Sequence, residues 1–495
     1  MSTPSHAEFV TVRANDGPLR GRRRGDGAVF LGVPYAQPPT GALRWRPPQA
    51  HAPWTDTRDA LTFGPDFPQA SNPRLRAPTQ DEDCLYLNIW TPTLEPTARL
   101  PVMVWIHGGG FTAGSGSDVR SDGARLCDEG AVVVSLNYRS GLFGFLAHPA
   151  LAHESPHGVS GNYGLLDQLM ALAWVRQNIA AFGGDPECVS AFGVSAGSAS
   201  IALLLTSAQA RGAFDRAILH SPGAGRPLAS LAQAQAAGEQ LGADLSALRN
   251  LSAQEVLART ALLNPAVRGL TTPRVLRPIR DGWLLPEDER PVFKSGRMHA
   301  MPLMVGSNAD EGSLLIRSWP VDTRAQWQAQ VQANFGAMAE QAAAHYPAAS
   351  DAEARAAVAQ MFADTQFNYG TRLLAQSMSP LERRTFKYLF TRRRPGHSDG
   401  PHHGEEVAHA FGNLNTLSDR ADARIEPWDE TLSATMRQAW VAFARQGDPN
   451  TCGAPHWAAY RPEEDNHLEF GDTVAPGAQW RKNPLDFLDR FFDLG

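Results

Sequence analysis

One short sequence, Phe192-Gly193-Val194-Ser195-Ala196-Gly197-Ser198, is the strongest indication of fold and chemistry in this chain. Residues 188–192 before it predict a buried strand, and residues 199–205 after it predict a helix. Passing from strand to helix so quickly needs a tight turn, which the glycines flanking the serine allow. We therefore predict a nucleophile elbow that exposes the Ser195 hydroxyl at the carboxyl edge of a sheet, with the Ala196 N–H at a helix N-terminus. An ordinary glycine-rich turn is the alternative, and the strand-then-helix context favours catalysis.

The composition is that of an ordinary globular protein. The 495 residues are 43% hydrophobic and 19% charged, with a formal net charge of −6. This charge gives no reason to expect nucleic acid or an anionic membrane as a partner. Residues 1–8 lack the charged start and apolar run of a secretory signal, and no stretch approaches the ~20 apolar residues of a membrane helix. The four cysteines are far apart and lack metal-type spacing, so we expect a reduced, cytoplasmic protein. Nothing in the sequence predicts the oligomeric state.

Strands and helices alternate along the chain. Helices are predicted over 165–181 and 439–445, and the apolar runs predict strands over 85–91, 102–106, 131–137, 188–192, 217–221, 301–306 and 385–390. This order predicts a mostly parallel sheet with helices on both faces. The alanine- and leucine-rich stretches 225–300 and 318–380 are expected to be helical insertions that cover the carboxyl edge of the sheet. We therefore expect one α/β domain over residues 1–495.

A nucleophilic serine needs a base, and the base needs an acid that orients it. The best acid follows the predicted strand at 301–306, where Asp310 and Glu311 are neighbours. The best histidine follows the strand at 385–390, where His402 and His403 are neighbours. Spacing alone does not separate the members of either pair. The glycines 108–110 follow the strand at 102–106, and their N–H groups are expected to bind an oxyanion together with Ala196.

These motifs have the order seen in one family. The chain resembles the type-B carboxylesterases, which include cholinesterases and bacterial para-nitrobenzyl esterases, along its whole length. The matching blocks are 32–36, 82–88, 107–111, 137–139, 161–168, 182–186, 310–312, 403–406, 411–413 and 447–450. The resemblance implies an α/β-hydrolase fold and hydrolysis of small-molecule esters without cofactor or metal. It also implies a triad of Ser195, His403 and Glu311, an oxyanion hole from the N–H groups of Gly109, Gly110 and Ala196, and a structural ion pair between Arg44 and Glu82.

Three departures from the family pattern bear on the substrate and the compartment. Val194 replaces the usual glutamate beside the nucleophile, which argues against cationic alcohols. Phe67 stands where the family has a cysteine, so Cys84 is expected to lack a disulfide partner. Leu228 stands where cholinesterases have a pocket tryptophan. Arg226 lies close by in sequence and could bind an acidic acyl group, so Arg226→Ala is expected to weaken substrates with a free carboxylate selectively; an exposed surface arginine is the alternative.

Several other residues suggest alternative sites or roles. A metal site is the first, since His397, Asp399, His402, His403, Glu406 and His409 are clustered in sequence, but they lack the His-Glu-x-x-His pattern. His107 is expected to fix the glycine loop, Ser221 to lie in or behind the pocket, and His402 to be a spectator near the pocket rim. A binding protein without activity is disfavoured because all three triad residue types are present. Amide or carbamate hydrolysis by the same acyl-enzyme route stays open.

Overall fold

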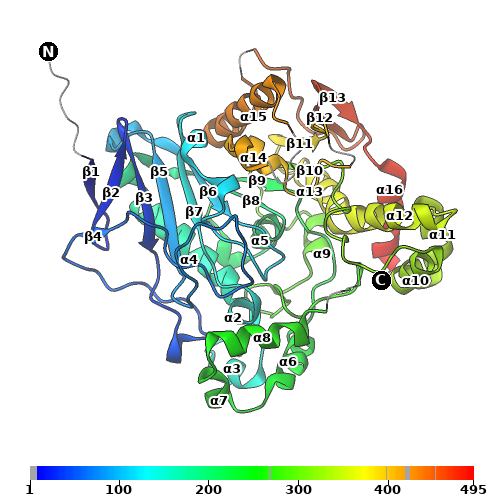
Figure 1. The fold of residues 1–495 in the computed structure, drawn as a ribbon, viewed down its shortest axis with the longest axis horizontal. Coiled ribbons are helices and arrows are strands. Elements are labelled where there is room, and N and C mark those ends of the chain that lie inside the picture. The colour runs from blue at the N-terminus through cyan, green and yellow to red at the C-terminus, as the bar shows by residue number, and fades with distance from the viewer. Residues whose placement is uncertain are drawn as a thin grey trace.

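A computed structural model describes most of the chain, namely residues 8–265, 267, 269–396, 399–417, 424–451 and 453–494. Within these residues, thirteen strands form one twisted sheet (Figure 1). The strand order is β1-β2-β3-β5-β7-β6-β8-β9-β10-β11-β12-β13, with the short β4 paired to β2. Their bounds are β1 Phe9–Arg13, β2 Pro18–Arg24, β3 Gly27–Pro34, β4 Arg58–Asp59, β5 Tyr86–Thr91, β6 Leu100–Ile106, β7 Val132–Leu136, β8 Gly184–Val194, β9 Arg216–His220, β10 Leu303–Asn308, β11 Thr385–Phe390, β12 Asn466–Phe470 and β13 Val474–Ala478.

The middle of the sheet is parallel, as the alternation of elements predicts. Neighbours from β7 through β6, β8, β9, β10 and β11 to β12 pair in parallel. The antiparallel pairs are β1–β2, β2–β3, β3–β5 and β5–β7 at one side and β12–β13 at the other. Because parallel strands run in one direction, the loops after β6, β8, β9, β10 and β11 all leave the same edge.

Both faces of the central strands are buried. Along β6, Val102 and Val104 pack into the core with α4 (Tyr163–Asn178) and α5 (Ala196–Leu204). Their neighbours Met103 and Trp105 pack into a second core with α14 (Glu406–Phe411) and α15 (Pro427–Gln446). Alternate side chains of a strand point to opposite faces. A strand that is buried on both faces therefore has apolar residues at consecutive positions in its sequence.

The remaining longer helices form two separate groups, one at the bottom and one at the right of the view (Figure 1). One group holds α3 (Pro149–Glu154), α6 (Leu231–Gly238), α7 (Leu245–Arg249) and α8 (Ala253–Leu263), and the other holds α10 (Arg324–Phe335), α11 (Ala339–His345), α12 (Asp351–Ala363) and the C-terminal α16 (Lys482–Leu494). Shorter or connecting helices are α1 (Ala124–Cys127), α2 (Gly141–Phe145), α9 (Glu289–Lys294) and α13 (Tyr369–Met378). A π-helical segment, Asp364–Asn368, joins α12 to α13.

The helical prediction for 225–300 is wrong in its middle part. No described residue between the end of α8 at Leu263 and the start of α9 at Glu289 is helical. Pro265, Pro273, Pro278 and Pro286 interrupt this segment, and proline removes a helix donor and restricts the residue before it. The described residues 264, 265, 267 and 269–288 therefore lie outside any helix, and residues 269–288 form a long loop.

Some elements near the C-terminus, the membrane-spanning potential and the domain division complete the description of the fold. β12, β13 and α16 were not predicted from the sequence; β12 and β13 complete one end of the sheet, and α16 packs against α11 and α13. None of the helices in the described part of the chain combines the length and the apolar character that crossing a membrane requires. The division into one domain with two insertions stays a prediction.

Candidate active site

Ser195 lies at the turn between β8 and α5, where the elbow is predicted. Its backbone has φ 58° and ψ −117°, a conformation that non-glycine residues rarely adopt. Its N–H donates to the carbonyl of His220 at 2.9 Å, which ties the turn to the end of β9. Its own carbonyl accepts from the N–H of Ala199 at 2.8 Å and begins the helix. The strained turn is thus held from both sides.

The two glycines of the elbow are required by the approach of β6. A Cβ at Gly197 would lie 2.0 Å from the carbonyl oxygen of Ile106, and one at Gly193 would lie 2.6 Å from the same atom. Both distances are far below van der Waals contact. The glycines let β6 and the elbow pack together, in addition to allowing the turn itself.

The glycine loop after β6 approaches the elbow. Gly109 and Gly110 have φ of +121° and +64°, and a Cβ at Gly109 would lie 2.0 Å from the carbonyl oxygen of Ala113. Among the described residues, no acceptor takes the N–H of Gly109, Gly110 or Ala196. Since Ala196 is the first residue of α5, its N–H is also a free helix-terminal donor.

Glu311 and His403 meet across two loops that are 92 residues apart in sequence. The Nδ1 of His403 lies 2.5 Å from Oε2 of Glu311. The other oxygen of Glu311 accepts from the Ser221 hydroxyl at 2.5 Å and from the Asn308 N–H at 2.6 Å. The Glu311 side chain is fully buried. Three donors therefore hold one buried carboxylate in a single orientation, and Ser221 lies behind the histidine rather than in the pocket.

Asn308, which the sequence analysis missed, joins the two loops. Its side-chain amide donates to the carbonyl of His402 at 2.6 Å and to the carboxylate of Glu406 at 2.5 Å. Glu406 is fully buried, and its other oxygen lies 3.4 Å from Nδ1 of His220. Burial raises the pKa of Glu406, but His220 and Asn308 outweigh it and lower this pKa below its ordinary value. The position of Asn308 at the carboxyl end of β10 is the signal in the sequence that could have identified it as a residue of the site.

Ser195 and His403 line one cavity of about 380 Å³. The Nε2 of His403 is buried and has no hydrogen-bond partner within the described chain. Its ring stacks on Phe367 of the π-helical segment, with centroids 4.2 Å apart. Of the other predicted site residues, Gly109, Gly110, Ala196 and Arg226 also line the cavity.

Leu228 does not reach this cavity. Its side chain is 6% exposed and packs in the main core, and its N–H donates to Asp288 at 2.8 Å. The position gives no support to the substrate-binding role expected from the resemblance. Arg226, two residues earlier, points to the cavity instead.

Comparison with known proteins shows the family of this chain. Residues 8–488 match the model of the carboxylesterase family. The chain belongs to the carboxylesterase family. It is 44% identical to the fumonisin B1 esterase of Sphingopyxis macrogoltabida over 92% of this chain and 85% of that protein, and 36% identical to the para-nitrobenzyl esterase of Bacillus subtilis (strain 168) over 94% and 95%. Two solved structures titled PNB esterase match with TM-scores of 0.83 and 0.84 at 33% and 34% identity, covering 97% and 96% of this chain and 99% of each of those chains.

This carboxylesterase therefore has the α/β-hydrolase fold and is a carboxylic ester hydrolase. The ion pair of Arg44 with Glu82 is confirmed, with Nε 2.8 Å from Oε2, and Arg44 also donates to the carbonyls of Arg249 and Leu251. The described cysteines Cys84, Cys127 and Cys188 are free thiols.

His107 is held within the glycine loop of the carboxylesterase. Its ring stacks on Tyr138, with centroids 4.3 Å apart, and its Nδ1 lies 2.8 Å from the carbonyl of Gly108. Burial lowers the pKa of His107 to about 4. The ring is thus neutral at physiological pH and packs as part of the loop.

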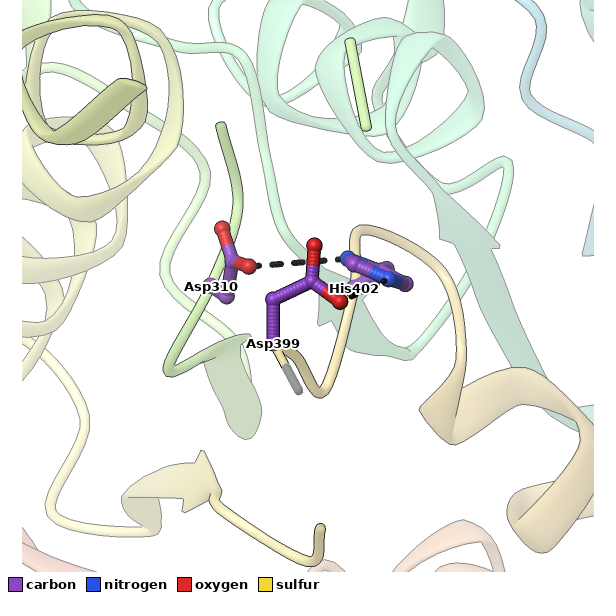
Figure 2. A group of neighbouring side chains, drawn as sticks. All are labelled: Asp310, Asp399 and His402. Atoms are coloured by element: carbon purple, nitrogen blue, oxygen red, sulfur yellow. Dashed lines mark ion pairs between the residues drawn. The ribbon is translucent and has the colours of Figure 1, made fainter. Parts of the chain in front are cut away.

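A second histidine–carboxylate pair lies directly beside the first. Figure 2 shows the carboxylates of Asp310 and Asp399 turned toward His402, at 3.5 Å from Nδ1 and 3.7 Å from Nε2 respectively. Asp310 and His402 also form a parallel β-bridge, so the two loops pair at the residues that precede Glu311 and His403. The hydrogen bond with Asp310 raises the pKa of His402, while burial raises that of Asp310 but is outweighed by His402 and Ser313, which lower it to about 2.

The geometry of this pair bears on the metal site, which the sequence offered only as a disfavoured alternative. Asp310, Asp399 and His402 could each offer a cation one ligand atom. However, the Asp310 carboxylate already accepts the N–H groups of Gly312, Ser313 and Gly400, and the raised pKa of His402 favours a positively charged imidazole beside this carboxylate. Of the histidine-rich set from the sequence, His403 meets Glu311, Glu406 meets Asn308, and His409 lies buried 3.9 Å from Asp429. His397 lies outside the described residues.

Proposed function

We propose that Ser195, His403 and Glu311 are the catalytic triad of this carboxylesterase and that Gly109, Gly110 and Ala196 form its oxyanion hole. The observation that carries the proposal is the 2.5 Å contact of His403 Nδ1 with a buried carboxylate, on a ring whose Nε2 has no hydrogen-bond partner among the described residues and which lines the same cavity as Ser195. A carboxylate on Nδ1 selects the tautomer in which Nε2 is the base.

The reaction then proceeds through an acyl-enzyme. Nε2 of His403 takes the hydroxyl proton as Ser195 attacks the ester carbonyl, and the N–H groups of Gly109, Gly110 and Ala196 stabilise the oxyanion. Glu311 stabilises the imidazolium without taking its proton. His403 protonates the departing alcohol, and water then repeats both steps on the acyl-enzyme and releases the acid.

The test combines activity with chemical labelling. Wild-type protein is expected to hydrolyse 4-nitrophenyl hexanoate and to be modified by an organophosphate at Ser195, as identified by peptide mass spectrometry. Ser195→Ala is expected to lose the label and at least about 10⁴-fold in kcat, and Glu311→Gln about 10³- to 10⁴-fold with the label site retained. Ser246→Ala, on the exposed α7, is the matched control and keeps full activity. A label on another residue would overturn the proposal.

Two alternatives receive less support. The relatives reported above are named esterases, so amide or carbamate hydrolysis is not favoured. An inactive binding protein has no need for a buried carboxylate aligned on a histidine beside an elbow serine. A burst of 4-nitrophenol equal to the enzyme concentration would support the acyl-enzyme directly.

We also propose that the enzyme works as a bacterial protein in a reducing, cytoplasmic compartment on small-molecule esters, with no nucleic-acid partner. The support is that the three described cysteines are unpaired and that Phe67, which stands in sequence where the family has a cysteine, borders the same small pocket as Cys84. Cell fractionation that recovers the native enzyme outside the cytoplasm would contradict this proposal.

A further inference from the structure

The cavity at Ser195 has a strongly cationic lining. The charged side chains among the described residues that line it, apart from His107 and His403, are one carboxylate, Asp118, and five guanidinium groups, Arg74, Arg120, Arg226, Arg274 and Arg277. Two of these guanidinium groups, those of Arg226 and Arg277, are buried, and burying a guanidinium group costs desolvation free energy that a bound anion would offset. The lining therefore points to an anionic substrate.

The arginines come from two walls. Arg74 and Arg120 share Asp118, with contacts of 3.6 Å and 2.9 Å. Arg120 belongs to the His403 side, because its Nη1 would lie 3.6 Å from a Cβ at Gly404. The other wall carries Arg226 from the loop after β9 and Arg277 from the loop 269–288, which also contributes Arg274 to the lining.

Arg226 is held on the serine side of the cavity. Its guanidinium donates to Gln366 Oε1 and, at 3.2 Å, to the carbonyl of Gly223. A Cβ at Gly223 would lie 3.9 Å from that of Ala199, one turn along α5 from Ser195. Gln366 is fixed in turn by the carbonyl of Leu270 at 2.8 Å. The guanidinium is thus preorganised, so that little entropy is lost when an anion binds.

Arg277 and a buried glutamate complete this wall. The Arg277 guanidinium lies 5.3 Å from the Phe111 ring centroid, and both Arg226 and Arg277 are 8% exposed. Glu289 lies behind them, 2% exposed, and accepts the Gly225 N–H at 2.6 Å. Burial raises the pKa of Glu289 to about 7, against the Gly225 N–H and the charges of Arg277 and Arg226. A partly protonated glutamate leaves the two guanidinium groups with a net positive charge at neutral pH.

We propose that Arg226 and Arg277 bind a free carboxylate of the substrate's acyl group, so that the enzyme prefers half-esters of dicarboxylic acids. The inference rests on the proposed function of Ser195. During the reaction the acyl group stays on Ser195, whereas the alcohol leaves from the His403 side. The wall that adjoins α5 therefore faces the acyl group, and planar guanidinium groups bind carboxylates in bidentate geometry.

The test compares matched esters. Mono-4-nitrophenyl adipate and 4-nitrophenyl hexanoate differ by a carboxylate in place of a terminal methyl group, and adipate is too long for rapid attack by its own carboxylate. A third ester, 4-carboxyphenyl hexanoate, carries the charge on the alcohol. We expect wild-type kcat/KM to be about 10- to 100-fold higher for the adipate than for either hexanoate ester.

The variants separate this inference from the proposed function. Arg226→Gln and Arg277→Met are each expected to lower kcat/KM for the adipate by about 10-fold or more while changing that for 4-nitrophenyl hexanoate less than about 3-fold. Arg297→Ala, a surface arginine paired with Glu287, is the charge-matched control and changes neither. Equal loss on both substrates, or a wild-type preference for the charged alcohol, would overturn the inference. If the wild-type protein hydrolyses none of the three esters, the proposed function itself is contradicted.

Discussion

Removal of the charge on Asp310 tests how the two loops of the site are held together. Asp310 and His402 directly precede Glu311 and His403, and they join the loops through an ion pair and a β-bridge. Asp310→Asn keeps the size of the side chain and an acceptor oxygen but removes the charge that faces His402. We expect a less stable protein and a lower kcat with little change in KM, because the catalytic pair loses its alignment.

The expected size follows from the pKa of Asp310. A carboxyl whose pKa falls from 3.8 to about 2 on folding contributes about 2 kcal/mol to the free energy of unfolding at neutral pH. Because the pKa is lowered, this contribution is present above pH 3.8 and is lost as the pH falls through 2. The pKa of His402 is raised on folding, so the positive charge of the His402 ring, and its attraction to Asp310, are lost as the pH rises through this raised pKa. The free energy of unfolding should therefore differ most between Asp310→Asn and wild type at a pH between about 4 and the pKa of His402.

The assay is urea unfolding followed by tryptophan fluorescence at pH 5, 6 and 9, with hexanoate hydrolysis measured on the same samples. Asp399→Asn is the matched comparison, since the Asp399 side chain is 42% exposed and its contact with His402 is 3.7 Å, so its effect should be smaller. Equal unfolding midpoints for Asp310→Asn and wild type at pH 6, or a difference that is as large at pH 9, would refute the reasoning.

Three other outcomes are expected. Ser221→Ala removes one of three donors to Glu311 and should lower kcat about 10- to 100-fold with the fold intact by circular dichroism; an unchanged kcat would show that this hydroxyl is dispensable. Gly197→Ala places a Cβ 2.0 Å from the last carbonyl of β6 and should give no active, folded protein, so retained activity would contradict the account of the elbow. Burial raises the pKa of Cys84 well above its ordinary value and that of Cys127 to about 12, so iodoacetamide at pH 8 should leave both unmodified until urea is added, as peptide mapping would show.

Features that depend on neighbours in sequence were predictable. The apolar run of β6, the strand–serine–helix pattern of the elbow and the glycines 108–110 are local, and the structure contains each of them where expected. The resemblance to a known family then singled out Glu311 and His403. Their 2.5 Å contact agrees with that choice, although the pattern of residues alone left Asp310 and His402 as equal candidates.

The tertiary structure decided which distant residues share the cavity. Arg277 reaches it from the loop 269–288, which its prolines keep from forming a helix, and Gln366, in a π-helical turn, meets Arg226 across 140 residues. Leu228, expected at the pocket, turns into the core two residues from Arg226. The sequence by itself determined the elbow that carries Ser195 and the strands that lead into the site, because each of these arises from contacts within a few residues. Substrate selection depended on the tertiary structure, because the walls of the cavity come from loops whose paths are set by packing against elements far away in the chain.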